Sequence, residues 1–273
     1  MTVTFVGREH RLGMWIHRVL CLLACLALGC AEPARTGAAR GPDVPILASP
    51  EARAIVDAPD RSADDRKLDA GRRPAELLTF LRVRQGMRVG ELMAGAGYTA
   101  ELLARAVGPT GVVYAENPRI VLEGSRAAWE RRLASPPNRN IVRVDRELDD
   151  PFPAEAKDLD LVVINLVYHD IVWMRADRAR MIAGIFASLR KGGHCAILDH
   201  SARPGTGEAD AQTLHRIDET LVRAEMQAGG FSLETGDSFL RNPSDSRDWN
   251  DSPQSLEPRR GTSDRFALLF ARP

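Results

Sequence analysis

The 273-residue chain is poor in aromatic residues and carries no net charge. Aromatic side chains make up 5% of the residues, which argues against a platform that stacks nucleic-acid bases. Lys plus Arg equals Asp plus Glu at 37 each, so the basic surface that phosphate binding needs is lacking. We therefore expect no nucleic-acid partner, and leave the oligomeric state open. Hydrophobic residues, at 44%, suffice for one large domain with a sizeable core.

Cysteine is equally scarce, with three of the four cysteines inside the first 30 residues. Cys195 stands alone in the rest of the chain, within an apolar run. Neither a disulfide framework nor a cysteine zinc site can be built from one thiol. We expect Cys195 to be a small buried side chain.

An uncharged stretch at 19–29 follows His17 and Arg18 near the N-terminus. It is shorter than the roughly 20 apolar residues that span a bilayer, and has the length of the apolar region of a secretory signal. Its end, LALGC, resembles a bacterial lipobox, in which Cys30 is acylated. Residues 1–30 are thus predicted to be a signal peptide, for which Met14 is an alternative start.

The segment 31–48 is rich in Pro, Gly, Ala and Arg and predicts a flexible tether. Together with the leader it predicts an exported protein of the periplasm or cell envelope, attached to the membrane by a lipid at Cys30. A leader that is not used would leave the protein in the cytoplasm.

From residue 49 onward, strand-like and helix-like segments alternate, which predicts a domain at 49–273. Residues 49–85 form a helical extension, in which Leu77, Leu78 and Leu81 share one face. The alternation predicts an α/β, Rossmann-like, doubly wound and mostly parallel sheet with a late antiparallel strand. Strands are expected at 87–93, 111–116, 140–144, 159–165, 194–199, 231–237 and 264–270, and helices at 98–107, 119–134, 177–193 and 210–228.

Two glycines, Gly95 and Gly97, follow the first predicted strand and open a helix, where a backbone can approach a ligand closely. Glu116 ends the second strand 19 positions after Gly97, where a carboxylate accepts hydrogen bonds from ribose hydroxyls. Glu91, before the glycines, would repel a pyrophosphate but suits a cationic cofactor. These residues favour S-adenosylmethionine (SAM) over NAD.

The stretch ELMAGAG resembles the first motif of class I SAM-dependent methyltransferases, usually written D/E-x-G-x-G-x-G, with Met93 in place of the first glycine. The segments VYHD, LRKGGHCAILDHSARPGTG, LHRIDETLVRAEMQAGGF and FLRNPSDSRDW resemble a bacterial family of predicted methyltransferases, some with export leaders. The resemblance covers about residues 50–273. It implies a seven-stranded methyltransferase fold, SAM as cofactor and a small-molecule acceptor. Tyr98 and Asp145, which follow the first and third strands, join Glu91, Gly95, Gly97 and Glu116 as expected cofactor-binding residues.

The residues after the fourth strand are the expected catalytic group. Methyl transfer to a hydroxyl needs an aligned nucleophile and a proton acceptor. His169 is the candidate base, with Tyr168 and Asp170 beside it; a hydrogen bond to a loop is the alternative role for His169.

A metal-dependent variant is a further possibility, because catechol-type O-methyltransferases hold Mg²⁺ at comparable strand ends. Asp170, Asp199 and His200 are the candidate ligands, and an imidazole among them favours a transition metal over Mg²⁺. Alternatively, Asp199 serves as a helix cap or loop lock.

The acceptor pocket is expected to include residues from the last third of the chain. The segment 240–262 is too long and too polar for a plain hairpin and predicts a lid over the site. Arg247 and Trp249 in this segment are further candidate contacts to the substrate. His215 and Asp218 are alternatively a solvated surface pair. The full expected set is His200, His215, Asp218 and Arg241.

Two alternative functions remain open from the sequence. One is a non-catalytic lipoprotein that keeps the fold but holds another ligand, because SAM is expected mainly in the cytoplasm. The other is a metal-dependent O-methyltransferase or hydrolase that uses Asp170, Asp199 and His200, together with His215 for hydrolysis.

Overall fold

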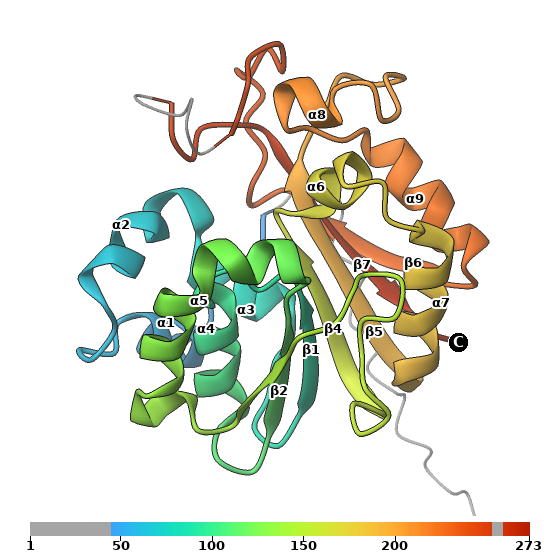
Figure 1. The fold of residues 1–273 in the computed structure, drawn as a ribbon. Coiled ribbons are helices and arrows are strands. Elements are labelled where there is room, and N and C mark those ends of the chain that lie inside the picture. Colours follow the sequence, from blue (N-terminus) through green and yellow to red (C-terminus); the bar gives the residue numbers. More distant parts are fainter. Residues whose placement is uncertain (1–44, 253–258) are drawn as a thin grey trace, which may run out of the picture. The chain divides into compact units, whose positions relative to one another are not determined.

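A seven-stranded sheet runs through the described residues, 45–252 and 259–273, of the computed structural model (Figure 1). Its strand order is β3-β2-β1-β4-β5-β7-β6. The first five strands are parallel, whereas β7 is antiparallel to both β5 and β6. The predicted doubly wound sheet with late antiparallel pairing is therefore confirmed. The strands are β1 (Arg88–Leu92), β2 (Val112–Glu116), β3 (Ile141–Val144), β4 (Leu159–Asn165), β5 (Leu189–His200), β6 (Ser232–Asp237) and β7 (Arg265–Ala271).

Helices cover both faces of this sheet (Figure 1). The strands bury alternate side chains toward two separate apolar clusters: Val113 and Ala115 belong to one, and Tyr114 to the other. The first cluster contains α1 (Pro50–Val56), α3 (Pro74–Phe80), α4 (Tyr98–Val107) and α5 (Arg119–Leu133). The second contains α6 (Tyr168–Trp173), α7 (Arg178–Ser188), α8 (Ala211–Leu214) and α9 (Glu219–Ala228). Cys195 is fully buried in the second cluster, as expected.

The expected helical extension, residues 49–85, consists of α1, α2 (Ala63–Arg72) and α3. The α2 helix begins after Ser62, whose side chain accepts a hydrogen bond from the Asp65 amide. It ends at Arg73 in the left-handed conformation, and Pro74 then starts α3. Leu77, Leu78 and Leu81, predicted to share a face, are all buried.

Two predicted helices differ from the structure. The helix expected at 177–193 ends at Ser188, because Leu189 already pairs with Leu159 and begins β5. The helix expected at 210–228 is split into α8 and α9 by His215 in the left-handed conformation. Apolar spacing alone does not reveal these breaks, which strand pairing and helix capping impose.

The predicted signal peptide, Cys30 and residues 31–44 of the predicted tether lie outside the described residues. Every described residue belongs to one unit, which spans Arg40–Pro273. Within the part that the structure describes, no helix has both the length and the apolar character to cross a membrane.

Candidate functional site

The turn between β1 and α4 is built for close approach by a ligand. Gly97 has φ +82° and lies against Trp129, where an added Cβ would come within 1.9 Å of the indole ring. Gly95 has φ +57°, and its Cβ direction faces open space. The buried Asn117 side chain holds this glycine at both backbone groups, accepting from its N–H at 2.7 Å and donating to its C=O at 3.2 Å. Asn117 and Trp129 thus fix the turn on its inner side, whereas the Cβ direction of Gly95 is open.

Met93 occupies the position of the glycine missing from the motif. Its φ of +50° lies in the left-handed region that a glycine would adopt freely. The turn therefore keeps the glycine-like path at that residue, at a cost of roughly 1–2 kcal/mol for a residue with a Cβ. The Met93 N–H donates to Glu116 Oε2 at 3.1 Å, which ties the turn to the end of β2.

Glu116 and Glu91 are buried carboxylates that lack a full set of partners. Within residues 45–252 and 259–273, Glu116 Oε1 and Glu91 Oε2 have no hydrogen-bond partner. Glu116 is fully buried and Glu91 is 3% exposed. An unsatisfied buried carboxylate oxygen costs folding free energy, so each oxygen marks a position where a hydrogen-bond donor or cation would be stabilising.

Burial strongly shifts the pKa of both acids. Burial raises the pKa of Glu91 to about 8, although a hydrogen bond from Thr99 and the charges of Arg72 and Arg132 oppose this. Burial also raises the pKa of Glu116 well above its usual value, with only the Met93 N–H opposing it. The charges of Arg72 and Arg132 therefore do not offset the burial of Glu91, and the nearby acids Glu147 and Asp145 add to the upward pKa shift of Glu116.

These features fit SAM. Its ribose hydroxyls are donors that match Glu116, and its methionine part is a cation that matches Glu91. Gly95 leaves space for the approach, and the two acids beside the turn are unsuited to a pyrophosphate.

Two expected cofactor-binding residues lie in other contacts. The Tyr98 hydroxyl donates to Asp69 of α2 at 2.7 Å, and the Arg72 guanidinium lies 4.4 Å from its ring centroid. Asp145 is about half exposed and forms a bidentate pair with Arg143 at 2.6 Å. Tyr98 thus positions α2 beside the turn.

Two residues that fix the turn, Arg132 and Asn117, were not expected from the sequence. Arg132 of α5 donates to the Ala96 carbonyl and pairs with Asp65 of α2 at 2.9 Å. Asn117 directly follows Glu116, so its place after a strand was a signal that could have identified it.

Three histidines gather at the carboxyl ends of β4 and β5. The His169 ring lies 5.5 Å from the His200 ring and 5.4 Å from the His215 ring, between centroids. Asp170 Oδ1 lies 3.4 Å from His169 Nε2 and 3.6 Å from His215 Nδ1. The structure thus brings together four expected residues, one of which, His215, comes from a distant segment.

Asp199 orients this cluster. Its Oδ1 lies 2.7 Å from His169 Nδ1 and accepts from the His200 N–H, and its Oδ2 accepts from the His169 N–H at 2.8 Å. Burial lowers the pKa of His169, but the Asp199 charge outweighs this and raises it to about 8. Burial raises the pKa of Asp170 despite the histidines around it.

The expected metal ligand set, Asp170, Asp199 and His200, is not supported. Asp199 is fully buried with both oxygens engaged by the protein, so the loop-locking alternative holds for it. His200 Nδ1 contacts Asp251 and lies 2.9 Å from Ser263 Oγ. The side chains that do converge are His169, Asp170 and His215.

Tyr168, expected in the catalytic group, is directed elsewhere. It is fully buried, and its hydroxyl donates to Glu225 of α9 at 2.5 Å. Arg178 binds the same carboxylate at 2.8 Å. Tyr168 therefore joins α6 to α9 through a hydroxyl that is already bonded within the protein.

The sequence matches no family model and no curated protein. The structure nevertheless resembles solved methyltransferases. A SAM-dependent methyltransferase from Aquifex aeolicus aligns with TM-score 0.55 and 16% identity, over 76% of this chain and 96% of that chain. CrArsM, an arsenic(III) S-adenosylmethionine methyltransferase from Chlamydomonas reinhardtii, aligns with TM-score 0.53 and 16% identity, over 82% of this chain and 73% of that chain. The fold is that of class I methyltransferases.

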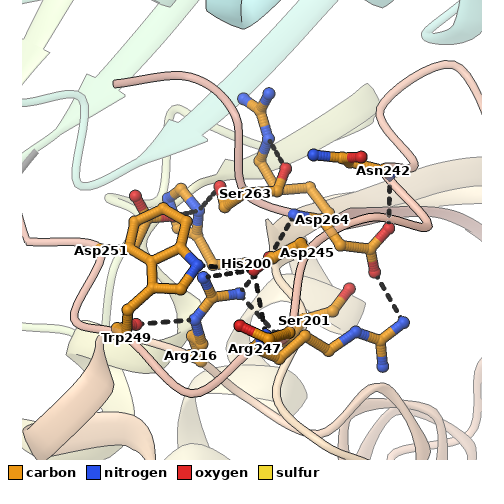
Figure 2. A network of polar contacts seen from close by, with 12 residues as sticks. His200, Ser201, Arg216, Asn242, Asp245, Arg247, Trp249, Asp251, Ser263 and Asp264 are labelled. Carbon is orange, nitrogen blue, oxygen red and sulfur yellow. Dashed lines mark hydrogen bonds and ion pairs between the residues drawn. The ribbon is translucent and has the colours of Figure 1, made fainter. Parts of the chain in front are cut away.

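In this methyltransferase fold, the segment between β6 and β7 carries an ordered polar network (Figure 2). Arg216 is fully buried, pairs with Asp245 at 2.8 Å and lies 4.6 Å from the Trp249 ring centroid. The Trp249 indole N–H donates to the same Asp245 at 2.7 Å. The described part of the expected lid is thus fixed to the domain, and Trp249 is held within it.

Arg241, Arg247 and Asp218, expected at or beside the acceptor pocket, line a separate hollow of about 340 Å³. Arg241 donates to Ser201 Oγ at 3.0 Å, and Arg247 pairs with Asp264 at 2.8 Å. Asp218 caps α9 and accepts from the Thr220 N–H at 2.9 Å. Asp218 is buried and shares no helix with His215, so the helical spacing behind the alternative of a solvated surface pair is absent here.

Proposed function

We propose that this chain is a SAM-dependent methyltransferase that acts on a small-molecule acceptor. The observation that carries the proposal is the pair of buried, incompletely bonded carboxylates, Glu91 and Glu116, on either side of an open glycine turn. The class I methyltransferase fold places this pair at the carboxyl edge of β1 and β2, where such sheets bind ligands.

Each residue of the pocket has a distinct binding role in this proposal. Glu116 accepts hydrogen bonds from the ribose hydroxyls, and Glu91 faces the ammonium and sulfonium end. Arg72, whose charge acts on Glu91, is a cation available to the cofactor carboxylate. Gly95 lets the backbone lie against the cofactor without a clash.

The histidine cluster supplies the acceptor side of the reaction. When bound, SAM supplies a methyl group on an activated sulfonium, so the protein mainly aligns the acceptor and lowers its proton affinity. His169 and Asp170 lie in the first turn of α6, just after β4, the strand next to β1. This is where an acceptor would meet the methyl group. We assign acceptor activation to these two residues. Among the described residues, no specific contact favours hydrolysis or a purely structural pocket.

The test is calorimetric binding of SAM and S-adenosylhomocysteine to the full chain. Glu116→Ala should weaken binding by about 1–3 kcal/mol, or roughly 5- to 150-fold, through lost ribose hydrogen bonds. Glu123→Ala is the matched control, because Glu123 is exposed and pairs only with Arg119 at the helix surface. Folded wild-type protein that binds neither compound would refute the proposal.

We also propose that the protein is exported and anchored by a lipid at Cys30. The support is the uncharged stretch at 19–29, its basic flank and the cysteine that ends LALGC. Fractionation of cells that express wild type or Cys30→Ser would test this: the variant should leave the membrane fraction. A variant that still fractionates as a lipoprotein would overturn the anchor.

A further inference from the structure

Two imidazoles and one carboxylate converge at the carboxyl edge of the sheet. His169 and Asp170 begin α6, and His215 ends α8. One ligand atom from each lies within 4.8 Å of the others. The Asp170 and His215 side chains are about a quarter exposed, whereas His169 is buried below them. The cluster is therefore reachable from solvent on one side.

The distances in this cluster do not suit hydrogen bonds. Asp170 Oδ1 lies 3.4 Å from His169 Nε2 and 3.6 Å from His215 Nδ1. A charge-assisted hydrogen bond would bring such atoms to about 2.7–2.9 Å. Ligands at about 2.0–2.1 Å from a tetrahedral ion are about 3.3–3.4 Å apart, which is close to both separations. The ligand nitrogens of the two imidazoles lie within 4.8 Å of each other, so they would have to approach by at most about 1.5 Å.

Asp199 prepares His169 to be a ligand. Because Asp199 Oδ1 lies 2.7 Å from Nδ1, the neutral His169 ring would keep its proton on Nδ1 and leave Nε2, which lies 3.4 Å from Asp170 Oδ1, available as a ligand. This carboxylate–histidine arrangement is the one that supports metal-binding imidazoles in proteins.

The backbone at His215 is strained in a way that serves the same site. Its φ of +53° places a non-glycine residue in the left-handed region. The neighbouring Arg216 is fully buried in an ion pair, and Asp218 caps α9, so both sides of His215 are fixed. These flanking contacts keep the His215 imidazole beside Asp170.

We propose that His169, Asp170 and His215 bind one divalent transition-metal ion. Two imidazoles favour an ion of the Zn²⁺ or Fe²⁺ class over Mg²⁺. Three protein ligands leave at least one coordination position for a water or for the acceptor. There the ion lowers the pKa of an acceptor hydroxyl or thiol. This role rests on the proposed methyl transfer, whereas ion binding itself does not.

The test is a titration of the EDTA-treated full chain with Co²⁺, which reports its coordination through visible absorption bands. We expect one ion per chain at the site and quenching of Trp173, whose ring centroid lies 6.4 Å from that of His215. Trp173→Phe should remove that quenching but keep the absorption bands. His215→Ala and Asp170→Asn should each lower the affinity by about 100-fold or more, and Asp199→Asn by about 10- to 100-fold.

His194→Ala is the matched control, because this half-buried histidine also contacts a carboxylate, Glu234 at 2.7 Å, outside the cluster. It should bind Co²⁺ as wild type does. Asp170→Asn changes a partly exposed side chain, so its thermal unfolding should stay near wild type and separate ligand loss from misfolding.

Absence of Co²⁺ binding by the wild type, or equal binding by folded His215→Ala and Asp170→Asn, would overturn the metal site. Unchanged methyl transfer in EDTA with loss of activity only in His169→Ala would assign His169 as a free base instead. SAM binding is measured separately, so a failed cofactor test and a failed metal test give different results.

Discussion

Buried acids at two places along the carboxyl edge of the sheet differ in how completely they are hydrogen-bonded. At the ends of β1 and β2, Glu91 and Glu116 retain oxygens without hydrogen-bond partners in the part of the chain that the structure describes. At the end of β5, Asp199 is equally buried but has both oxygens bonded to His169 and the adjoining backbone. The region at β1 and β2 therefore has oxygens that can accept hydrogen bonds from a ligand. The region at β5 uses its acid to fix the positions of neighbouring side chains.

This difference separates binding from positioning. An unsatisfied buried acid lowers stability but gains free energy when a cation or donor arrives, so substitutions there should mainly affect ligand affinity. A satisfied buried acid has no capacity for a ligand, so its loss should mainly affect stability and the geometry of its partners.

The largest expected effect is the loss of Asp199. Asp199→Ala removes one partner of a buried, charge-assisted pair and should lower the free energy of unfolding by about 3–5 kcal/mol. Urea unfolding measures this. Asp170→Asn, at a partly exposed carboxylate of the same cluster, should cost about 1 kcal/mol or less. If both variants lose the same free energy of unfolding, Asp199 and Asp170 do not differ in their structural roles.

Gly97→Ala should have the next largest effect. Its Cβ would meet Trp129 at 1.9 Å, and φ is +82°, so the turn must shift at a cost of roughly 2–3 kcal/mol. SAM affinity should fall with it in calorimetry. Gly95→Ala is the paired test, because open space limits its penalty to backbone strain of about 1 kcal/mol. If both variants bind SAM as wild type does, the turn is not the cofactor site.

A smaller effect concerns the pH dependence of stability. Glu91 has a folded-state pKa of about 8, whereas an unfolded Glu titrates near about 4.3. Between these values the folded state holds a proton that the unfolded state has released. Stability should therefore fall as pH rises, by up to about 1.4 kcal/mol per pH unit from this residue. The raised pKa of Glu116 contributes with the same sign.

Glu91→Gln should flatten part of this slope, because an amide carries no titrating proton. Urea unfolding at several pH values between about 5 and 8 measures the slope. Glu123→Gln, at the exposed surface of α5, should leave the slope unchanged. A Glu91→Gln slope parallel to that of wild type would show that Glu91 is not the buried, raised-pKa acid.

The sequence allowed the strands and the glycine turn between β1 and α4 to be predicted well, because their signals are local. Apolar runs such as LDLVVIN identify buried strands, and the spacing from Gly97 to Glu116 follows from one helix and one strand. The helix boundaries near Leu189 and His215 were wrong, since pairing of Leu189 with Leu159 and capping by Asp218 decide them.

The acceptor half was predicted only in part. His169 and Asp170 were identified by their place after a strand, but Tyr168 and Asp199 were assigned to chemistry although their bonds are satisfied within the protein. The hydrogen-bond partners of these residues come from distant segments of the chain. Glu225, for example, is the partner of Tyr168, and the local sequence does not reveal it.

The sequence by itself determined the sheet, the glycine turn and the two acids beside it, because alternating apolar segments and the residues at their ends are readable locally. Only the tertiary structure decided which side chains remain free. It places His215 beside Asp170, which lies 45 positions earlier in the chain, and it bonds Asp199 to His169. Among the described residues, it leaves one carboxylate oxygen each of Glu91 and Glu116 without a hydrogen-bond partner. The reason is physical: a buried polar group is defined by its partners, and most of those partners lie far away in the sequence.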